Sequence, residues 1–196
     1  MSVNDSWRDV PPTPEAQLAR LIHAPFLSHC GALFPRDLLY ELDGYDESLV
    51  TDEDGDLLIR LLMQGYTFKA VPEVRYFYLH HGGARVSADD DPMKLGARER
   101  VCDKVIEAFE SLGGMPLPIC EALAQRLDTI AMSSWYSDRD RGKRLIAKAR
   151  AVCPSYRLPG RLPLRIARRI GGPDLALRAS GLARRLRGRL TGGVRA

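Results

Sequence analysis

The segment LDGYDESLVTDEDGDLLIRLLMQGYTF, residues 42–68, places an acidic turn directly before a leucine-rich run. Four leucines recur at helical spacing and form one apolar face: Leu57, Leu58, Leu61 and Leu62. Thr51 is the expected N-cap, Asp54 follows it three residues later, and Gly65 is expected to end the helix. The acidic triplet 52–54 has two interpretations, since it can cap the helix or supply catalytic carboxylates.

Length and composition favour one globular domain with a tail. The chain has 196 residues, of which 45% are hydrophobic, and no apolar run approaches the ~20 residues of a membrane-spanning helix. Residues 1–17 lack the basic start and apolar stretch of a secretory signal, and their prolines predict a flexible arm. The four cysteines form no C-x-x-C pair, which favours buried thiols in a reduced, cytoplasmic location.

Charge divides the chain at residue 157. Residues 157–196 contain eleven arginines and one acid, which leaves 18 Lys+Arg and 24 Asp+Glu in residues 1–156 out of totals of 29 and 25. The tail is predicted to form two amphipathic helices, with Leu182, Leu186 and Leu190 on one apolar face. It has three interpretations: an anchor on an anionic membrane, a solvated helix packed on the body, or a nucleic-acid contact without a recognised motif.

The remaining pattern predicts an α/β region followed by helices. Helices are expected within residues 16–26 and 35–44, and strands at 26–34, 66–71 and 74–81. From Pro92 onward the periodicity predicts helices at 93–112, 118–137 and 140–153. The predicted organisation is therefore an arm at 1–17, an α/β half-domain at 18–91, a helical region at 92–156 and a basic tail at 157–196.

Residues 32–87 resemble the C-terminal half of the catalytic domain of family 2 glycosyltransferases, which have the GT-A fold. Six pieces agree in order and spacing: Gly44-Tyr45-Asp46-Glu47, Glu53-Asp54, Asp56-Leu57 with Arg60-Leu61, Gly65-Tyr66, Val71-Pro72 and His81-Gly82. The resemblance implies a partial GT-A half-domain. It also implies inverting transfer of a sugar from a nucleotide-sugar donor to a hydroxyl of a glycan or lipid-linked acceptor.

The resemblance also assigns roles to individual residues. Asp54 would be the general base that takes the acceptor proton, with Glu53 as its neighbour. His81 would help to hold a divalent metal, Mg²⁺ or Mn²⁺, and its diphosphate. Substrate binding would fall to four residues near the acceptor and the leaving diphosphate: Asp46, Glu47, Gly82 and Arg85.

The donor-binding half of such an enzyme has no counterpart in this sequence. No Asp-x-Asp follows a buried strand, and only about thirty residues precede the matching region, too few for several βα units. The sequence therefore suggests a truncated enzyme, a split enzyme whose partner chain supplies the other half, or a remnant with a new role. The rival hypothesis is a non-catalytic interaction protein, or one peripheral to the inner face of the membrane, that keeps the half-domain as a scaffold.

Overall fold

The computed structural model describes residues 2–3, 10–24, 27, 31–71, 73, 77–78, 91–135 and 137–157. The chain divides into two compact units, Met1–Tyr156 and Arg157–Ala196. Of the second unit only Arg157 is described, so the fold presented below is that of the first unit.

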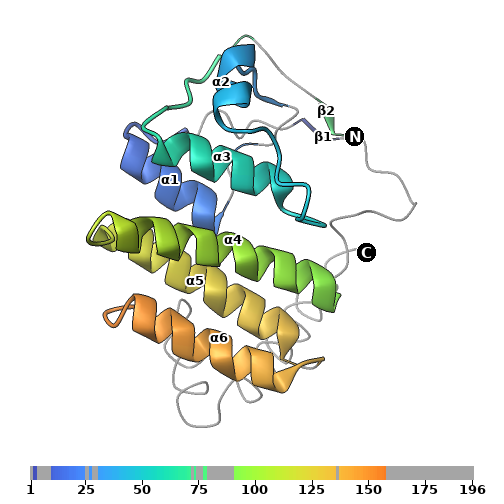
Figure 1. The fold of residues 1–196 in the computed structure, drawn as a ribbon, viewed down its shortest axis with the longest axis vertical. Coiled ribbons are helices and arrows are strands. Elements are labelled where there is room, and N and C mark those ends of the chain that lie inside the picture. The colour runs from blue at the N-terminus through green and yellow to red at the C-terminus, as the bar shows by residue number, and fades with distance from the viewer. Residues whose placement is uncertain are drawn as a thin grey trace, which may run out of the picture. The chain divides into compact units, whose positions relative to one another are not determined.

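The described residues form six helices and one pair of very short strands (Figure 1). The helices are α1 Pro14–His23, α2 Arg36–Glu41, α3 Glu53–Met63, α4 Pro92–Ser111, α5 Leu117–Ser134 and α6 Arg139–Val152. The strands β1 Ser2–Val3 and β2 Phe77–Tyr78 pair in antiparallel fashion. Within the described part of the chain, no helix is long and apolar enough to cross a bilayer.

The prediction of an α/β fold with a partial GT-A half-domain is wrong. Residues 66–71 alternate like a strand, yet no strand forms there. The side-chain amide of Gln17 in α1 occupies the pairing positions instead: Phe68 N donates to its Oε1 at 2.8 Å, and its Nε2 donates to Phe68 O at 3.0 Å. A glutamine side chain thus satisfies the backbone groups that a neighbouring strand would have paired.

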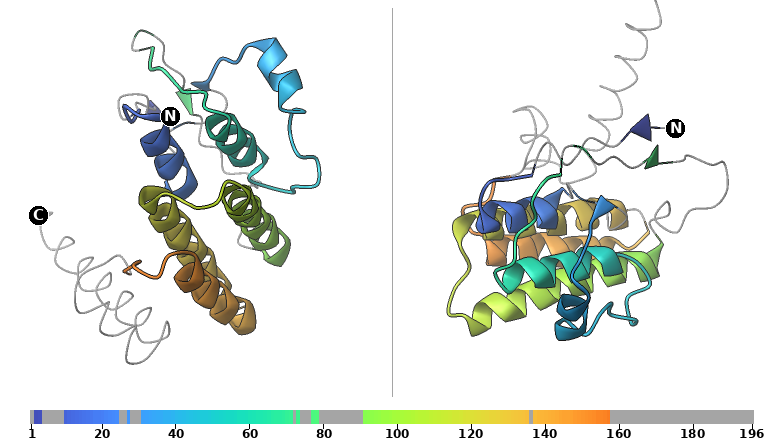
Figure 2. Two further views of the ribbon diagram at one scale, coloured as in Figure 1. Left: turned by 60° about the vertical axis from the view of Figure 1, so that its left-hand side comes forward. Right: turned by 90° about the horizontal axis from the view of Figure 1, so that it is seen from above.

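Helix α5 is the centre of the core. It contacts α1, α4 and α6, and the left view of Figure 2 shows α1 and α3 in one layer, α5 and α4 in the next, and α6 beyond them. Its sequence explains this position, because buried residues cover most of the circumference of the helix: Ile119, Cys120, Ala122, Leu123, Ala124, Leu127, Asp128, Ile130, Ala131 and Ser134. A helix with so wide a buried face is stable only when other helices pack on several sides of it.

The predicted helices after Pro92 are confirmed, with their ends fixed by local signals. Asp91 caps α4 by accepting a hydrogen bond from Lys94 N at 2.9 Å, and Pro92 begins the helix. Gly113 has a φ of 82° and ends it, a conformation that glycine adopts without strain. Cys102, Cys120 and Cys153 are free and buried, as the spacing of the cysteines suggested.

Two expectations about helix starts are wrong. Helix α1 begins at Pro14, inside the segment expected to be a flexible arm, because Thr13 accepts a hydrogen bond from Ala16 N at 3.2 Å and proline fits a first helical turn. The N-cap of α3 is Asp52 rather than Thr51, and Asp52 has a left-handed backbone with a φ of 68°.

Candidate functional site

Asp52 connects the start of α3 to two other helices. Its carboxylate pairs with the guanidinium of Arg126 in α5, and Arg126 also donates to Ile22 O at the end of α1 at 3.0 Å. Burial lowers the pKa of Arg126 to about 10, which leaves it charged at neutral pH. A Cβ at Gly55 would lie 2.6 Å from Oδ1 of Asp52, so the glycine leaves room for this carboxylate.

Asp56 follows the N-cap Asp52 by four residues, lies in the first turn of α3 and is only 2% exposed. Its carboxylate accepts from Nε of Arg60 at 2.8 Å and from Nζ of Lys104 in α4 at 2.5 Å. The cations remain in contact with water, since the side chain of Arg60 is 25% exposed and that of Lys104 is 37% exposed. The buried acid is therefore fully paired with cations that lie at the surface.

The same two cations hold the loop between α2 and α3. Arg60 donates to Leu42 O at 2.5 Å and to Gly44 O at 2.7 Å, and Lys104 donates to Asp46 at 3.1 Å. We call the four charged residues the Asp56 network: Asp46, Asp56, Arg60 and Lys104. The two negative and two positive charges of this network sum to zero. Its hydrogen bonds and ion pairs tie the loop to α3 and α4.

The predicted catalytic pair, Glu53 and Asp54, occupies the first turn of α3 and is half-buried. Oδ1 of Asp54 accepts from the next backbone amide, Gly55 N, at 2.8 Å. Neither residue lines the pocket between α3 and α4 or the pocket around Asp46. The catalytic roles of Glu53 and Asp54 stay predictions.

Asp46 forms the turn that precedes α3. Its Oδ1 accepts from the hydroxyl of Ser48 at 2.6 Å and from Ser48 N at 3.0 Å. These bonds, the Ser48 hydroxyl first, and the neighbouring Lys104 lower the pKa of Asp46 to about 2. Asp46 and Glu47 line an acidic pocket of about 460 Å³ together with Asp43, Tyr45 and Lys104.

The other predicted site residues, His81, Gly82 and Arg85, lie outside the described residues, as does the basic tail beyond Arg157. Within the described ranges no three His, Cys, Asp or Glu side chains come together to hold a metal ion. The carboxylates of Asp52 and Asp56 already face arginine and lysine side chains, so they do not fit a divalent cation. The metal contact predicted for His81 remains a prediction.

A groove lined mainly by apolar residues lies between α3 and α4, and the sequence did not predict it. Both helices run in the same direction in Figure 1, and α3 packs closely on α1 but more loosely on α4. The groove measures about 430 Å³. Its apolar lining comes from both helices: Ile59, Met63, Val101, Val105, Ala108 and Leu112. The i, i+4 and i+7 spacing of 101, 105 and 108 on α4 is a signal in the sequence that could have indicated this wall of the groove.

A comparison with known protein families, curated proteins and solved structures finds no match to this chain. Together with the helical fold, this overturns the resemblance to family 2 glycosyltransferases. Several matching pieces are ordinary signals of helix ends and helix surfaces. Gly44 and Gly65 follow α2 and α3 with φ values of 62° and 89°, and Asp56 and Arg60 form an ion pair one helical turn apart.

Proposed function

We propose that the helical unit is a non-catalytic interaction module whose groove between α3 and α4 binds an amphipathic helix of a partner protein. The apolar groove is the observation that carries this proposal. Its lining on α4 extends from Val101 to Leu112, about 16 Å at 1.5 Å per residue. Leu112, at one end, is 72% exposed.

The open form of the groove favours a helix over a small molecule. A small-molecule pocket encloses most of its ligand, whereas this groove is partly open to solvent. An amphipathic helix needs only one covered face, and it places apolar side chains at i, i+3, i+4 and i+7 along such a groove. Burial of apolar area from both sides would supply the binding free energy.

Other functions rest on the sequence alone. Sugar transfer with Asp54 as base has no support among the described residues beyond the presence of the residue itself, and it stays a prediction. Binding of residues 157–196 to an anionic membrane, and a partner chain that completes an enzyme, are likewise predictions. The interaction module is favoured over these functions because the described residues include a surface that suits it, an apolar groove of known position and lining.

The test is binding of a synthetic amphipathic helix with a leucine face and neutral glutamines elsewhere. Fluorescence anisotropy would measure its affinity for the full chain, and methyl NMR would report on Ile59, Val101 and Val105 in the groove. We expect saturable binding that shifts these methyl resonances.

Two double variants locate the site. Ala108→Gln with Leu112→Gln changes the groove, and we expect it to weaken binding at least tenfold. Met93→Gln with Leu117→Gln changes two exposed apolar residues that do not line the groove, and binding should stay within about twofold. Equal loss in both variants, or binding that leaves the groove methyls unshifted, would refute the proposal.

A further inference from the structure

The apolar groove and the acidic pocket adjoin each other. Lys104 lines both, so the pocket formed by Asp43, Tyr45, Asp46 and Glu47 lies next to the Lys104 end of the groove. Asp56 and Arg60, which also line the groove, lie at this same end because Lys104 binds Asp56. Charged side chains therefore line one end of the groove, and the apolar side chain of Leu112 lines the other.

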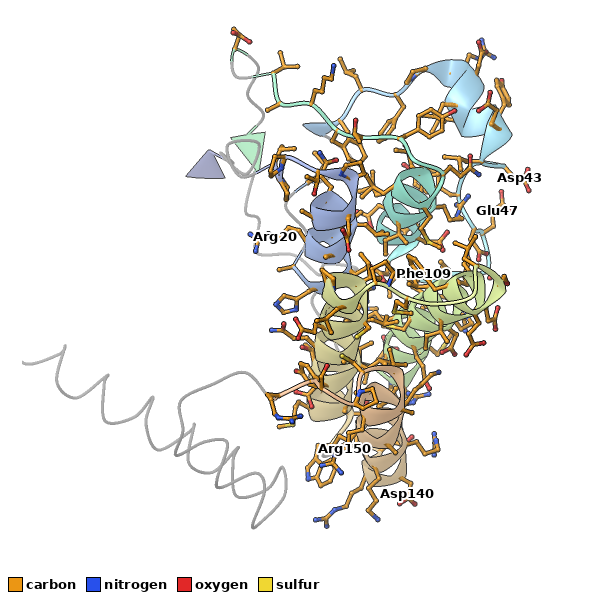
Figure 3. All side chains as sticks on the ribbon, turned by 90° about the vertical axis from the view of Figure 1, so that its left-hand side faces the viewer. Arg20, Asp43, Glu47, Phe109, Asp140 and Arg150 are labelled. Atoms are coloured by element: carbon orange, nitrogen blue, oxygen red, sulfur yellow. The ribbon has the colours of Figure 1, made fainter. Side chains whose placement is uncertain are left out.

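The acids of this pocket are not equivalent. Asp46 pairs with Lys104 and belongs to the neutral Asp56 network. Asp43 and Glu47 are exposed, and Figure 3 shows both on the same side of the unit, pointing outward. Among the residues that the structure describes, neither forms an ion pair. The pocket end of the groove therefore has two negative charges that no cation in the described part of the chain neutralises.

Tyr45 adds an aromatic surface to the two carboxylates. Its side chain is 47% exposed and lines the same pocket. An arginine can pair with carboxylates through its planar guanidinium and stack on an aromatic ring at the same time. The combination of two acids and a tyrosine therefore suits arginine better than it suits a neutral side chain.

We infer that the helix bound in the groove is basic at one end, with an arginine that enters the acidic pocket beside its apolar face. This inference rests on the proposed function. The occupant is a partner segment of defined chemistry: its apolar residues cover Met63, Ala108 and Leu112, the accessible part of the groove lining, and its arginine meets Asp43 and Glu47.

Three versions of the synthetic leucine-faced helix test the inference on the full chain. They carry arginine, glutamine or glutamate at one terminus and are otherwise identical. We expect the arginine version to bind about fivefold more tightly than the glutamine version, as for two exposed ion pairs, and the glutamate version to bind most weakly. The preference should shrink as salt is raised.

The variant Asp43→Asn with Glu47→Gln should bring the arginine and glutamine versions to within about twofold. Glu15→Gln with Glu121→Gln, two exposed acids on α1 and α5, is the matched control and should keep the preference. Equal binding of the arginine and glutamine versions to the native chain would overturn the inference and leave the interaction module intact. Arginine-dependent binding that survives the groove variant Ala108→Gln with Leu112→Gln would also overturn it.

Discussion

Replacing Asp56 by asparagine keeps the shape of the side chain and removes the charge that two cations share. Asp56 is buried and accepts from both Arg60 and Lys104. Asparagine can accept at only one of its two terminal atoms, so one cation loses its partner and faces an amide N–H₂. The matched control is Asp54→Asn, two residues earlier on the same helix, where the oxygen that accepts from Gly55 N can be retained.

The size of the effect follows from burial. Breaking a fully buried ion pair costs about 3–5 kcal/mol. Here the cost is lower, because the side chains of Arg60 and Lys104 are 25% and 37% exposed and recover some hydration. Each cation also keeps other contacts, Arg60 with the carbonyls of Leu42 and Gly44. We therefore expect Asp56→Asn to lower the free energy of unfolding by about 2–3 kcal/mol, less than the full value for a buried pair.

The control should change stability much less. Asp54→Asn loses the favourable interaction of a negative charge with the N-terminus of α3, about 0.3–1 kcal/mol. Urea unfolding followed by far-UV circular dichroism gives the two free energies, and thermal unfolding should show a Tm lowered by about 4–12 °C for Asp56→Asn. An Asp56→Asn variant within about 0.5 kcal/mol of the native chain, or one no less stable than Asp54→Asn, would refute the role assigned to the Asp56 network.

Three further changes test the packing. Gly142→Ala would place a Cβ 2.7 Å from the Trp135 ring and should lower the free energy of unfolding by about 1–3 kcal/mol, measured by thermal unfolding. Its control is Gly96→Ala, whose Cβ has room and which should be neutral or stabilising. Equal effects of the two changes would contradict the packing of Gly142 on Trp135. Gln17→Leu removes the amide that is hydrogen-bonded to three backbone groups, Phe68 N, Phe68 O and Pro11 O, and should cost about 2–4 kcal/mol in urea unfolding, so an unchanged midpoint would count against these contacts. Burial raises the pKa of Cys120 from 9.0 to about 12. The stability that comes from keeping this thiol neutral is therefore present below pH 9.0 and lost as the pH rises toward 12. Alkylation of Cys120 at pH 8 should be far slower in the folded chain than in the unfolded chain, and equal rates would contradict the prediction.

Helix positions were the most predictable part of this protein. The leucines of α3, the apolar stripe of α4 and the glycines after both helices are signals within a few residues of one another. A helix closes its hydrogen bonds within one turn, so these signals act locally and can be read without the rest of the chain. The helices at 92–111, 117–134 and 139–152 were predicted for this reason, to within a few residues at each end.

Strands and site partners were less predictable, because each needs a residue far away in the sequence. The alternation at 66–71 fits a strand, but only folding brings Gln17 against Phe68 and fills the pairing positions. The acids of the α3 segment looked alike in the sequence. In the folded chain Asp52 forms an ion pair with Arg126, and Asp56 forms one with Lys104. Asp43 and Glu47 stay exposed and line the acidic pocket.

The sequence alone thus determined where the chain is helical, which glycines end the helices and how charge is divided between residues 1–156 and 157–196. The tertiary structure alone decided which acids are neutralised, that no sheet of the GT-A kind forms in the described part, and that α3 and α4 leave an apolar groove between them. The physical reason is the range of the interactions. Helical hydrogen bonds and caps join near neighbours, whereas ion pairs and grooves depend on how separate helices pack.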